Sequence, residues 1–167
     1  PMYTLHDETH ICNVLRIMAQ LLGDHTDKLT RDEAAMLILA ACCHDVGMSY
    51  SVQEKQELLE DNERLDQYLE QHHDEYVKAY SENPDVPKLT GEIQRNYLRS
   101  IHHERILELL NSVSWPDCLW GKVDRDDLIQ VCQSHGENPS DLNHLECPST
   151  IDLRFCAVLL GLGDVLD

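Results

Sequence analysis

The chain has few positively charged residues. Lysine and arginine together number 13, against 31 aspartates and glutamates, and the formal net charge at pH 7 is -18. Nonspecific binding to nucleic acid depends on lysines and arginines that neutralise phosphates, and binding to an anionic membrane surface depends on the same residues. The composition therefore argues against both kinds of partner. Aromatic residues are also scarce, with a single phenylalanine, so we expect a mainly aliphatic core.

The sequence also has no C-x-x-C pair, and its seven cysteines are an odd number. Several cysteines fall in helical apolar patterns, namely Cys12, Cys42, Cys132 and Cys156. We expect these to be buried free thiols in a reducing compartment. There is no signal peptide and no apolar run of membrane-spanning length. These absences together predict a cytoplasmic protein.

The length of 167 residues suits one domain with a real core. We therefore expect residues 1–167 to form a single domain. The chain opens at Pro1 and stops at Asp167, directly after an apolar helical pattern. This predicts a domain cut from a longer protein.

Apolar residues recur at helical spacing, and no useful β alternation is present, so the predicted fold class is all-α. The apolar run Ala34–Cys43 predicts a central buried helix. Two capping boxes, Thr30–Glu33 and Ser149–Asp152, predict helix starts. Helices are expected over 6–22, 91–111, 126–135 and 149–164, and another from Thr30 to an end at Val46-Gly47. One or two solvent-facing helices are expected over 53–82, and loops over 83–87, 112–123 and 136–148.

The pair His44-Asp45 stands at the end of the apolar run. An imidazole beside a carboxylate offers two metal ligands of different character at one point of the backbone. Other ionisable residues on or beside apolar stripes are His10, His102 or His103, His135 and Asp164. Burying each of them alone would be costly. Their recurrence predicts a buried metal site.

Histidine with aspartate suits Mn, Fe, Ni, Zn or Mg better than a soft-metal site. Asp45 could bridge two divalent ions, with His10, His44 and Asp164 completing one and His102 and His135 the other. Two such ions would activate water and neutralise phosphate oxygens. The other histidines, His25, His72, His73 and His144, are expected to face solvent, and His6 to support the site or face substrate.

The order His10, His44-Asp45, Asp164 resembles the H…HD…D signature of the HD superfamily of metal-dependent phosphohydrolases. His102 and His135 resemble the additional ligands of its two-metal members. Three further segments are similar to HD domains found ahead of GHKL-type, chaperone-like ATPase domains: Tyr-Thr-Leu-His-Asp-Glu-Thr-His near the start, Arg99-x-x-His102, and Leu-Gly-Asp-Val-Leu-Asp at the end.

The resemblance implies an all-α HD-domain helical bundle around a central buried metal site, with divalent ions, two in number, as cofactors. It implies hydrolysis of a phosphoester in a nucleotide or other small phosphorylated molecule. Asp45 would bridge the ions, while Arg99 and His103 would orient the phosphate. It also implies a C-terminal ATPase domain as a partner in the longer protein.

Two departures qualify the resemblance. Many HD phosphodiesterases have lysine three residues after the aspartate, where this chain has Met48. His102-His103-Glu104 resembles the start of the HHE element of cyclic-dinucleotide phosphodiesterases, but the Gly-Tyr-Pro that should follow is absent. His102 is preferred over His103 as a ligand, because it lies on the stripe of Leu98 and Ile106.

Two other functions fit the same residues. One is a regulatory module that binds metal and nucleotide and controls an attached ATPase domain, which the missing lysine at Met48 favours. The other is a di-iron oxygenase, because histidine and carboxylate ligands suit iron as well as manganese. Turnover of a phosphorylated substrate, or iron-dependent consumption of oxygen, would separate these hypotheses.

Overall fold

The computed structural model describes residues 8–60, 62–82, 91–114, 123–145 and 150–167. Within these ranges the secondary structure is helical, without strands, which confirms the all-α prediction. The predicted loop over 83–87, His6, most of the predicted loop over 112–123 and the residues 146–149 lie outside the described residues. None of the described helices is both long and apolar enough to span a membrane.

The chain divides into two compact units, and each is described by itself. The first unit comprises Pro1–Gly47 and His103–Asp167, and the second comprises Met48–His102. Helix α6 (Gly91–Ser112) contributes residues to both. The expectation that residues 1–167 form one domain stays a prediction.

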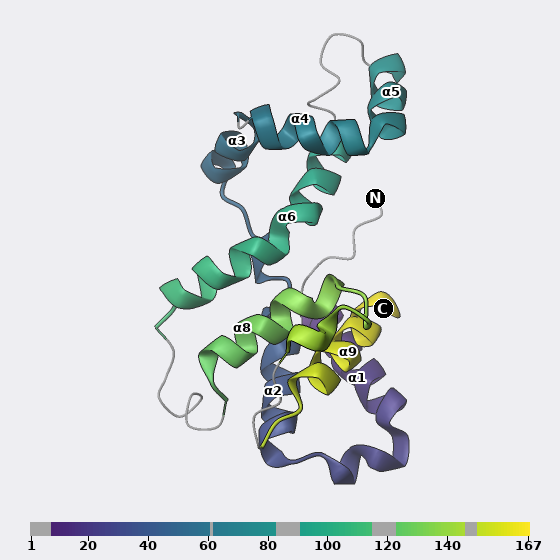
Figure 1. Ribbon diagram of the computed structural model, residues 1–167, viewed down its shortest axis with the longest axis vertical. Helices are drawn as coiled ribbons and strands as arrows, with labels where there is room; N and C mark the ends of the chain where they lie inside the picture. The colour runs from purple at the N-terminus through teal and green to yellow at the C-terminus, as the bar shows by residue number, and fades with distance from the viewer. Residues whose placement is uncertain (1–7, 61, 83–90, 115–122, 146–149) are drawn as a thin grey trace. The chain divides into compact units, whose positions relative to one another are not determined.

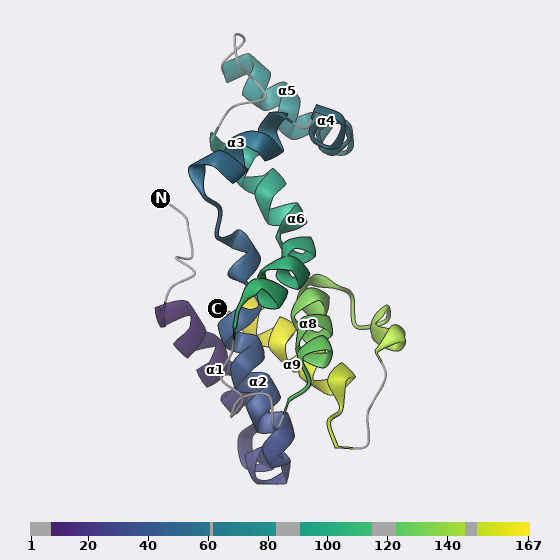
Figure 2. The same cartoon turned by 90° about the vertical axis from the view of Figure 1, so that its left-hand side faces the viewer.

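Four helices pack against one another in the first unit: α1 (Glu8–Leu22), α2 (Arg31–Cys43), α8 (Arg125–Gln133) and α9 (Leu153–Val165). Figures 1 and 2 show them side by side. Short 3-10 turns follow α1, α2 and α8, namely η1 (Gly23–Lys28), η2 (Val46–Met48) and η4 (Ser134–Gly136), and η5 (Leu142–His144) precedes α9. The first unit is thus a helical bundle.

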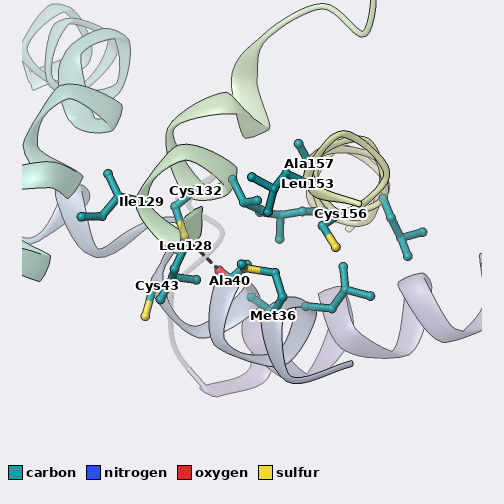
Figure 3. Close-up of a cluster of buried hydrophobic side chains, with 14 of the residues drawn as sticks. Met36, Ala40, Cys43, Leu128, Ile129, Cys132, Leu153, Cys156 and Ala157 are labelled. Atoms are coloured by element: carbon teal, nitrogen blue, oxygen red, sulfur yellow. Dashed lines mark hydrogen bonds between the residues drawn. The ribbon is translucent and has the colours of Figure 1, made fainter. Parts of the chain in front are cut away.

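The core of this bundle is aliphatic, as expected. Figure 3 shows Met36 and Ala40 of α2 facing Leu128 and Cys132 of α8, with Leu153 of α9 beside them. The thiol of Cys132 donates to the carbonyl of Ala40 at 3.9 Å. Burial raises the pKa of the Cys43 thiol to about 12, so this thiol packs as a neutral, inert group.

Helix α2 is central but not buried on every side. Met36, Ala40 and Cys43 are buried, whereas Ile38 is 53% exposed and Cys42 is also exposed. The prediction of a central buried helix therefore holds for the face of Met36, Ala40 and Cys43 and not for the face of Ile38 and Cys42. Cys12 is exposed too, so the expectation of buried thiols holds for Cys132 and Cys156 but not for Cys12 and Cys42. Apolar periodicity predicts a helix, but it does not show how many of the faces of that helix are covered by other helices.

The two predicted capping boxes have different outcomes. At α2 the Thr30 side chain accepts from the Glu33 N–H, and the Glu33 carboxylate accepts from the Thr30 N–H. At α9 the cap is Asp152, whose side chain accepts from the Phe155 N–H at 2.9 Å. The predicted cap residue Ser149 lies outside the described residues, and α9 itself begins at Leu153, directly after Asp152.

The second unit, Met48–His102, is the smaller of the two. It contains α3 (Val52–Glu60), α4 (Asn62–Gln71), α5 (His73–Glu82) and the first part of α6. The sequence predicted one or two helices where three are present. Its buried cluster comes from α4 and α6, namely Leu65, Tyr68, Leu69, Ile93, Tyr97 and Ile101.

Candidate metal centre

The centre of the site is His44-Asp45, directly after α2. His44 is the C-cap residue, and its backbone N–H donates to the Ala40 carbonyl. The imidazole is fully buried, and its Nδ1–H donates to the carbonyl of Ala41 at 3.0 Å. Because Nδ1 is occupied by this local hydrogen bond, Nε2 is the nitrogen that faces other parts of the fold.

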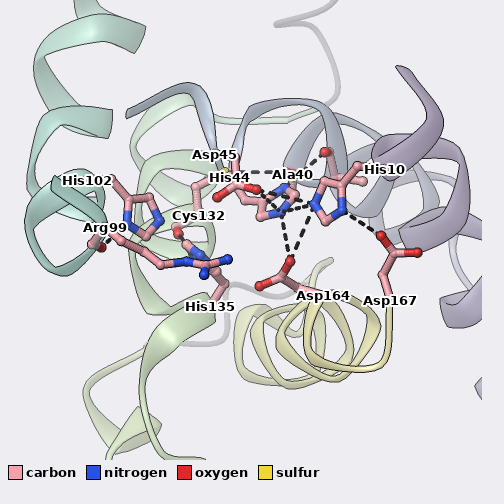
Figure 4. A network of polar contacts seen from close by, with 11 residues as sticks. His10, Ala40, His44, Asp45, Arg99, His102, Cys132, His135, Asp164 and Asp167 are labelled. Carbon is pink, nitrogen blue, oxygen red and sulfur yellow. Dashed lines mark hydrogen bonds and ion pairs between the residues drawn. The ribbon is translucent and has the colours of Figure 1, made fainter. Parts of the chain in front are cut away.

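Side chains from three places in the sequence converge on this nitrogen (Figure 4). His44 Nε2 lies 3.2 Å from His10 Nε2, 3.0 Å from Asp45 Oδ2 and 3.6 Å from Asp164 Oδ1. His10 Nε2 lies 3.3 Å from Asp45 Oδ2 and 3.4 Å from Asp164 Oδ1. The structure therefore brings together the predicted residues His10, His44, Asp45 and Asp164.

These distances fit one divalent ion. Such an ion holds nitrogen and oxygen ligands at about 2.0–2.2 Å, which places neighbouring ligand atoms roughly 3 to 3.6 Å apart. Two imidazole nitrogens and two carboxylate oxygens at this spacing are donors suited to Mn, Fe, Ni or Zn. The cluster is thus compatible with metal binding in both donor type and spacing.

In the metal-free protein, a proton on His44 offsets part of the negative charge of Asp45 and Asp164. Burial disfavours a charged His44, but its hydrogen bonds and charge interactions with Asp164 and Asp45 raise its pKa to about 10. Burial would raise the pKa of Asp164, but its hydrogen bond and attraction to His44 lower it. The same two carboxylates that stabilise the proton on His44 would also attract a metal ion. Because a metal-ligating histidine must be neutral, binding of the ion would displace this proton.

His135 lies beside this group. It belongs to η4, is 8% exposed, and its Nδ1–H donates to the carbonyl of Cys132. Its ring meets that of His44 edge-on, with the ring centroids 5.1 Å apart. A ligand atom of Asp45 lies within 4.8 Å of one of His135. Asp45 is thus shared between the His10–His44–Asp164 group and His135.

Close backbone packing holds His135 against α9. A Cβ atom placed on Gly161 would lie 2.7 Å from the backbone oxygen of His135, which is closer than real contacts allow. Glycine at this position therefore permits the approach of η4 to the helix that carries Asp164.

The remaining predicted residues lie on α6. Arg99 and His102 belong to the second unit, and His103 opens the second segment of the first unit. His102 is buried, and its Nδ1–H donates to the carbonyl of Arg99. His103 is partly buried, and its carbonyl accepts from Gln133. The ligand role of His102 and the phosphate roles of Arg99 and His103 stay predictions.

One residue of the site was missed by the sequence reasoning. Asp167 Oδ2 lies 2.9 Å from Nδ1 of His10, and the Asp167 side chain is only 8% exposed. The available signal was its position three residues after Asp164, because a carboxylate so close along the chain to a predicted ligand lies within reach of the same site.

Comparison with protein families matches the HD-CE family over residues 1–167. No curated protein and no solved structure matches the chain. The matched span includes both units and every residue of the His10–His44–Asp45–Asp164 cluster. The chain therefore belongs to the HD-CE family of HD-type domains.

Proposed function

We propose that this protein hydrolyses a phosphoester of a nucleotide or another small phosphorylated molecule, with divalent ions held by the described cluster. The observation that carries the proposal is the convergence of His10, His44, Asp45 and Asp164 within 4.8 Å. When bound, such ions supply Lewis acidity that activates water and neutralises phosphate oxygens. Membership of an HD-type family supports the same reaction class.

The chain's own groups have separable roles in this proposal. His10 and His44 present Nε2, and Asp45 and Asp164 balance the cationic charge. The Asp45 and Asp164 side chains are 13% and 27% exposed, so neither carboxylate is fully closed off from solvent. The net charge of -18 disfavours long polyanions, which supports a small substrate. Arg99 and His103 are proposed to orient its phosphate.

The position of Asp45 supports a second ion. Its carboxylate faces His10 and His44 and also lies near His135, and one carboxylate can bridge two ions. We propose His135, together with His102, as ligands of the second ion, drawn from Mn, Fe, Ni, Zn or Mg. Removal of His102 should then reduce two equivalents of metal to one, whereas His103→Ala should keep both. If His103→Ala loses one equivalent of metal and removal of His102 does not, His103 is the ligand and His102 is not.

Metal content and hydrolysis, measured together, test the proposal. Metal per chain is measured by plasma mass spectrometry, and hydrolysis is measured on a panel of nucleotides and other phosphoesters with added Mn, Co, Ni or Mg. Asp45→Asn should lose metal and activity. Asp27→Asn makes the same charge change on the exposed turn η1 and should retain both.

Three other outcomes would each contradict hydrolysis by this protein. Metal and nucleotide binding without turnover would replace hydrolysis by the regulatory function, including control of an attached ATPase domain. Iron-selective loading with oxygen consumption would replace it by an oxygenase. Absence of metal after reloading would overturn the proposal.

A further inference from the structure

The two histidines of the cluster and the neighbouring His135 are hydrogen-bonded at Nδ1 in two different ways. For His44 and His135, Nδ1–H donates to a carbonyl three residues earlier, on Ala41 and Cys132. For His10 the partner of Nδ1 is instead a carboxylate, Asp167 Oδ2 at 2.9 Å, which is 157 residues away in the sequence. His10 is thus held by tertiary structure rather than by its own helix.

Asp164 and Asp167 lie on opposite sides of the His10 ring. Asp164 Oδ1 is 3.4 Å from Nε2, and Asp167 Oδ2 is 2.9 Å from Nδ1. Figure 4 shows Asp167 beyond the ring, away from His44. The two carboxylates are three residues apart, and the Asp167 N–H donates to the Asp164 carbonyl at 3.2 Å. Asp164 in the last turn of α9 and Asp167 just after the helix therefore contact the two nitrogens of one imidazole.

Close contact between α9 and α1 fixes this arrangement. A Cβ atom on Gly163 would lie 2.8 Å from Met18 Cγ and 3.2 Å from Val14 Cγ1. Val14 is one helical turn after His10, and Gly163 directly precedes Asp164. The helices are thus held in contact next to the paired side chains, so Asp167 meets His10 in a defined position.

From this geometry we infer that Asp167 is a positioning residue, which fixes His10 with the proton on Nδ1 and the lone pair of Nε2 toward the cluster. A carboxylate that accepts the second N–H of a ligand histidine orients the ring and makes its other nitrogen a stronger donor. Asp167 acts through His10, because it contacts Nδ1, whereas His44, Asp45 and Asp164 lie near Nε2. The inference depends on the metal-binding part of the proposed function, not on the identity of the substrate.

Two measurements on Asp167→Ala test the inference. In ¹⁵N NMR of the metal-free protein at alkaline pH, His10 should carry its proton on Nδ1, and the variant should shift protonation toward Nε2. Cobalt affinity, measured by competition with a chromophoric chelator, should fall by about 10- to 100-fold, with a changed cobalt absorption spectrum. Asp167→Glu should restore part of both properties, and Asp27→Ala should match the wild type.

The results separate this inference from the proposed function. Wild-type protein that binds cobalt, with unchanged affinity and spectrum in Asp167→Ala, would overturn the positioning role while leaving the metal site intact. A wild-type His10 that carries its proton on Nε2 would overturn it as well. Wild-type protein that binds no metal would overturn the proposed function, and with it the role of Asp167 in metal binding. If Asp167→Ala does not fold, Asp167→Asn and Asp167→Glu are compared by the same two measurements.

Discussion

Each unit holds a histidine by a hydrogen bond from Nδ1–H to a nearby backbone carbonyl, but the surroundings of the two rings differ. In the second unit, Nδ1–H of His72 donates to the carbonyl of Tyr68 at 2.9 Å, and the ring stacks on Tyr68 at 4.1 Å. In the first unit, His44 makes the equivalent bond to Ala41, but its Nε2 also meets Asp45 and Asp164. A histidine bonded to its own helix is therefore no site by itself. His44 differs from His72 because carboxylates, one of them from a distant segment of the chain, converge on its second ring nitrogen.

That convergence depends on the size of the core. The first unit buries side chains from α1, α2, α8 and α9, whereas the buried cluster of the second unit comes from α4 and α6. Burial of polar groups requires hydrogen-bonding partners in fixed positions. The larger core supplies them, and His10, His44 and His135 are all buried there.

Removal of one core leucine from each unit would test this difference. Leu128→Ala should lower the free energy of unfolding by about 4 to 5 kcal/mol, near the top of the range for such changes, because the rigid core leaves a cavity. Leu65→Ala, which is equally buried, should cost only about 2 to 3 kcal/mol, because its smaller cluster can collapse around the gap. Urea denaturation of both variants provides the measurement. Equal losses would contradict the contrast.

The close approach at Gly161 offers a more local test. Gly161→Ala should destabilise the protein by about 1–3 kcal/mol and displace His135, because the new Cβ meets backbone rather than a flexible side chain. Gly136→Ala is the matched control, since its Cβ would meet nothing within 4 Å, and it should stay within about 0.5 kcal/mol of the wild type. Thermal unfolding and histidine NMR follow both effects. An undisturbed His135 signal in Gly161→Ala would count against the packing argument.

The pH dependence of the metal-free protein tests the polar part of the first unit. The pKa of His44 is about 10 when folded and 6.5 in its unperturbed state, so the folded protein binds this proton more tightly. Its stabilisation is complete below pH 6.5 and is lost as pH rises toward 10, by at most about 1.4 kcal/mol per pH unit. The free energy of unfolding, measured with chelator present, should therefore fall from pH 6.5 upward.

The pH range of this experiment has an upper limit, and a variant provides its control. Cys43 and Cys132 have raised pKa values when folded because of burial, so their unfolded thiols add to the loss of stability near their ordinary pKa of 9.0. Measurements should stop below that pH. His44→Gln should remove most of the slope. A stability that stays flat or rises over this range in the wild type would refute the raised pKa.

Local features of the fold could be predicted from the sequence, and features set by distant neighbours could not. The capping box of Thr30 and Glu33 is predictable because both partners lie within one helical turn. The exposure of Ile38 and Cys42 depends on which helices cover α2, and the pattern of α2 alone does not contain that information.

The candidate site follows the same division. His10, His44, Asp45 and Asp164 could be named because ionisable residues on apolar stripes need partners, and the structure brings these four together. Asp167 was missed because its partner His10 is 157 residues away and a carboxylate at a helix end is common on surfaces. The stripe of Leu98 and Ile106 favours His102 over His103 as a ligand, but which of the two meets an ion depends on residues of other helices, which the pattern of α6 alone does not contain.

The wide separation of the clustered side chains also has a consequence for biosynthesis. A nascent chain contains His10, His44 and Asp45 long before Asp164 and Asp167 of the α9 segment have been made. At about 5–20 residues per second, the interval from Asp45 to Asp164 is roughly 6 to 24 s. During that time only one of the three carboxylates around His10, that of Asp45, exists. Under the proposed function, tight capture of an ion would therefore be a late event in synthesis, and ion uptake would mark a chain whose α9 has already docked.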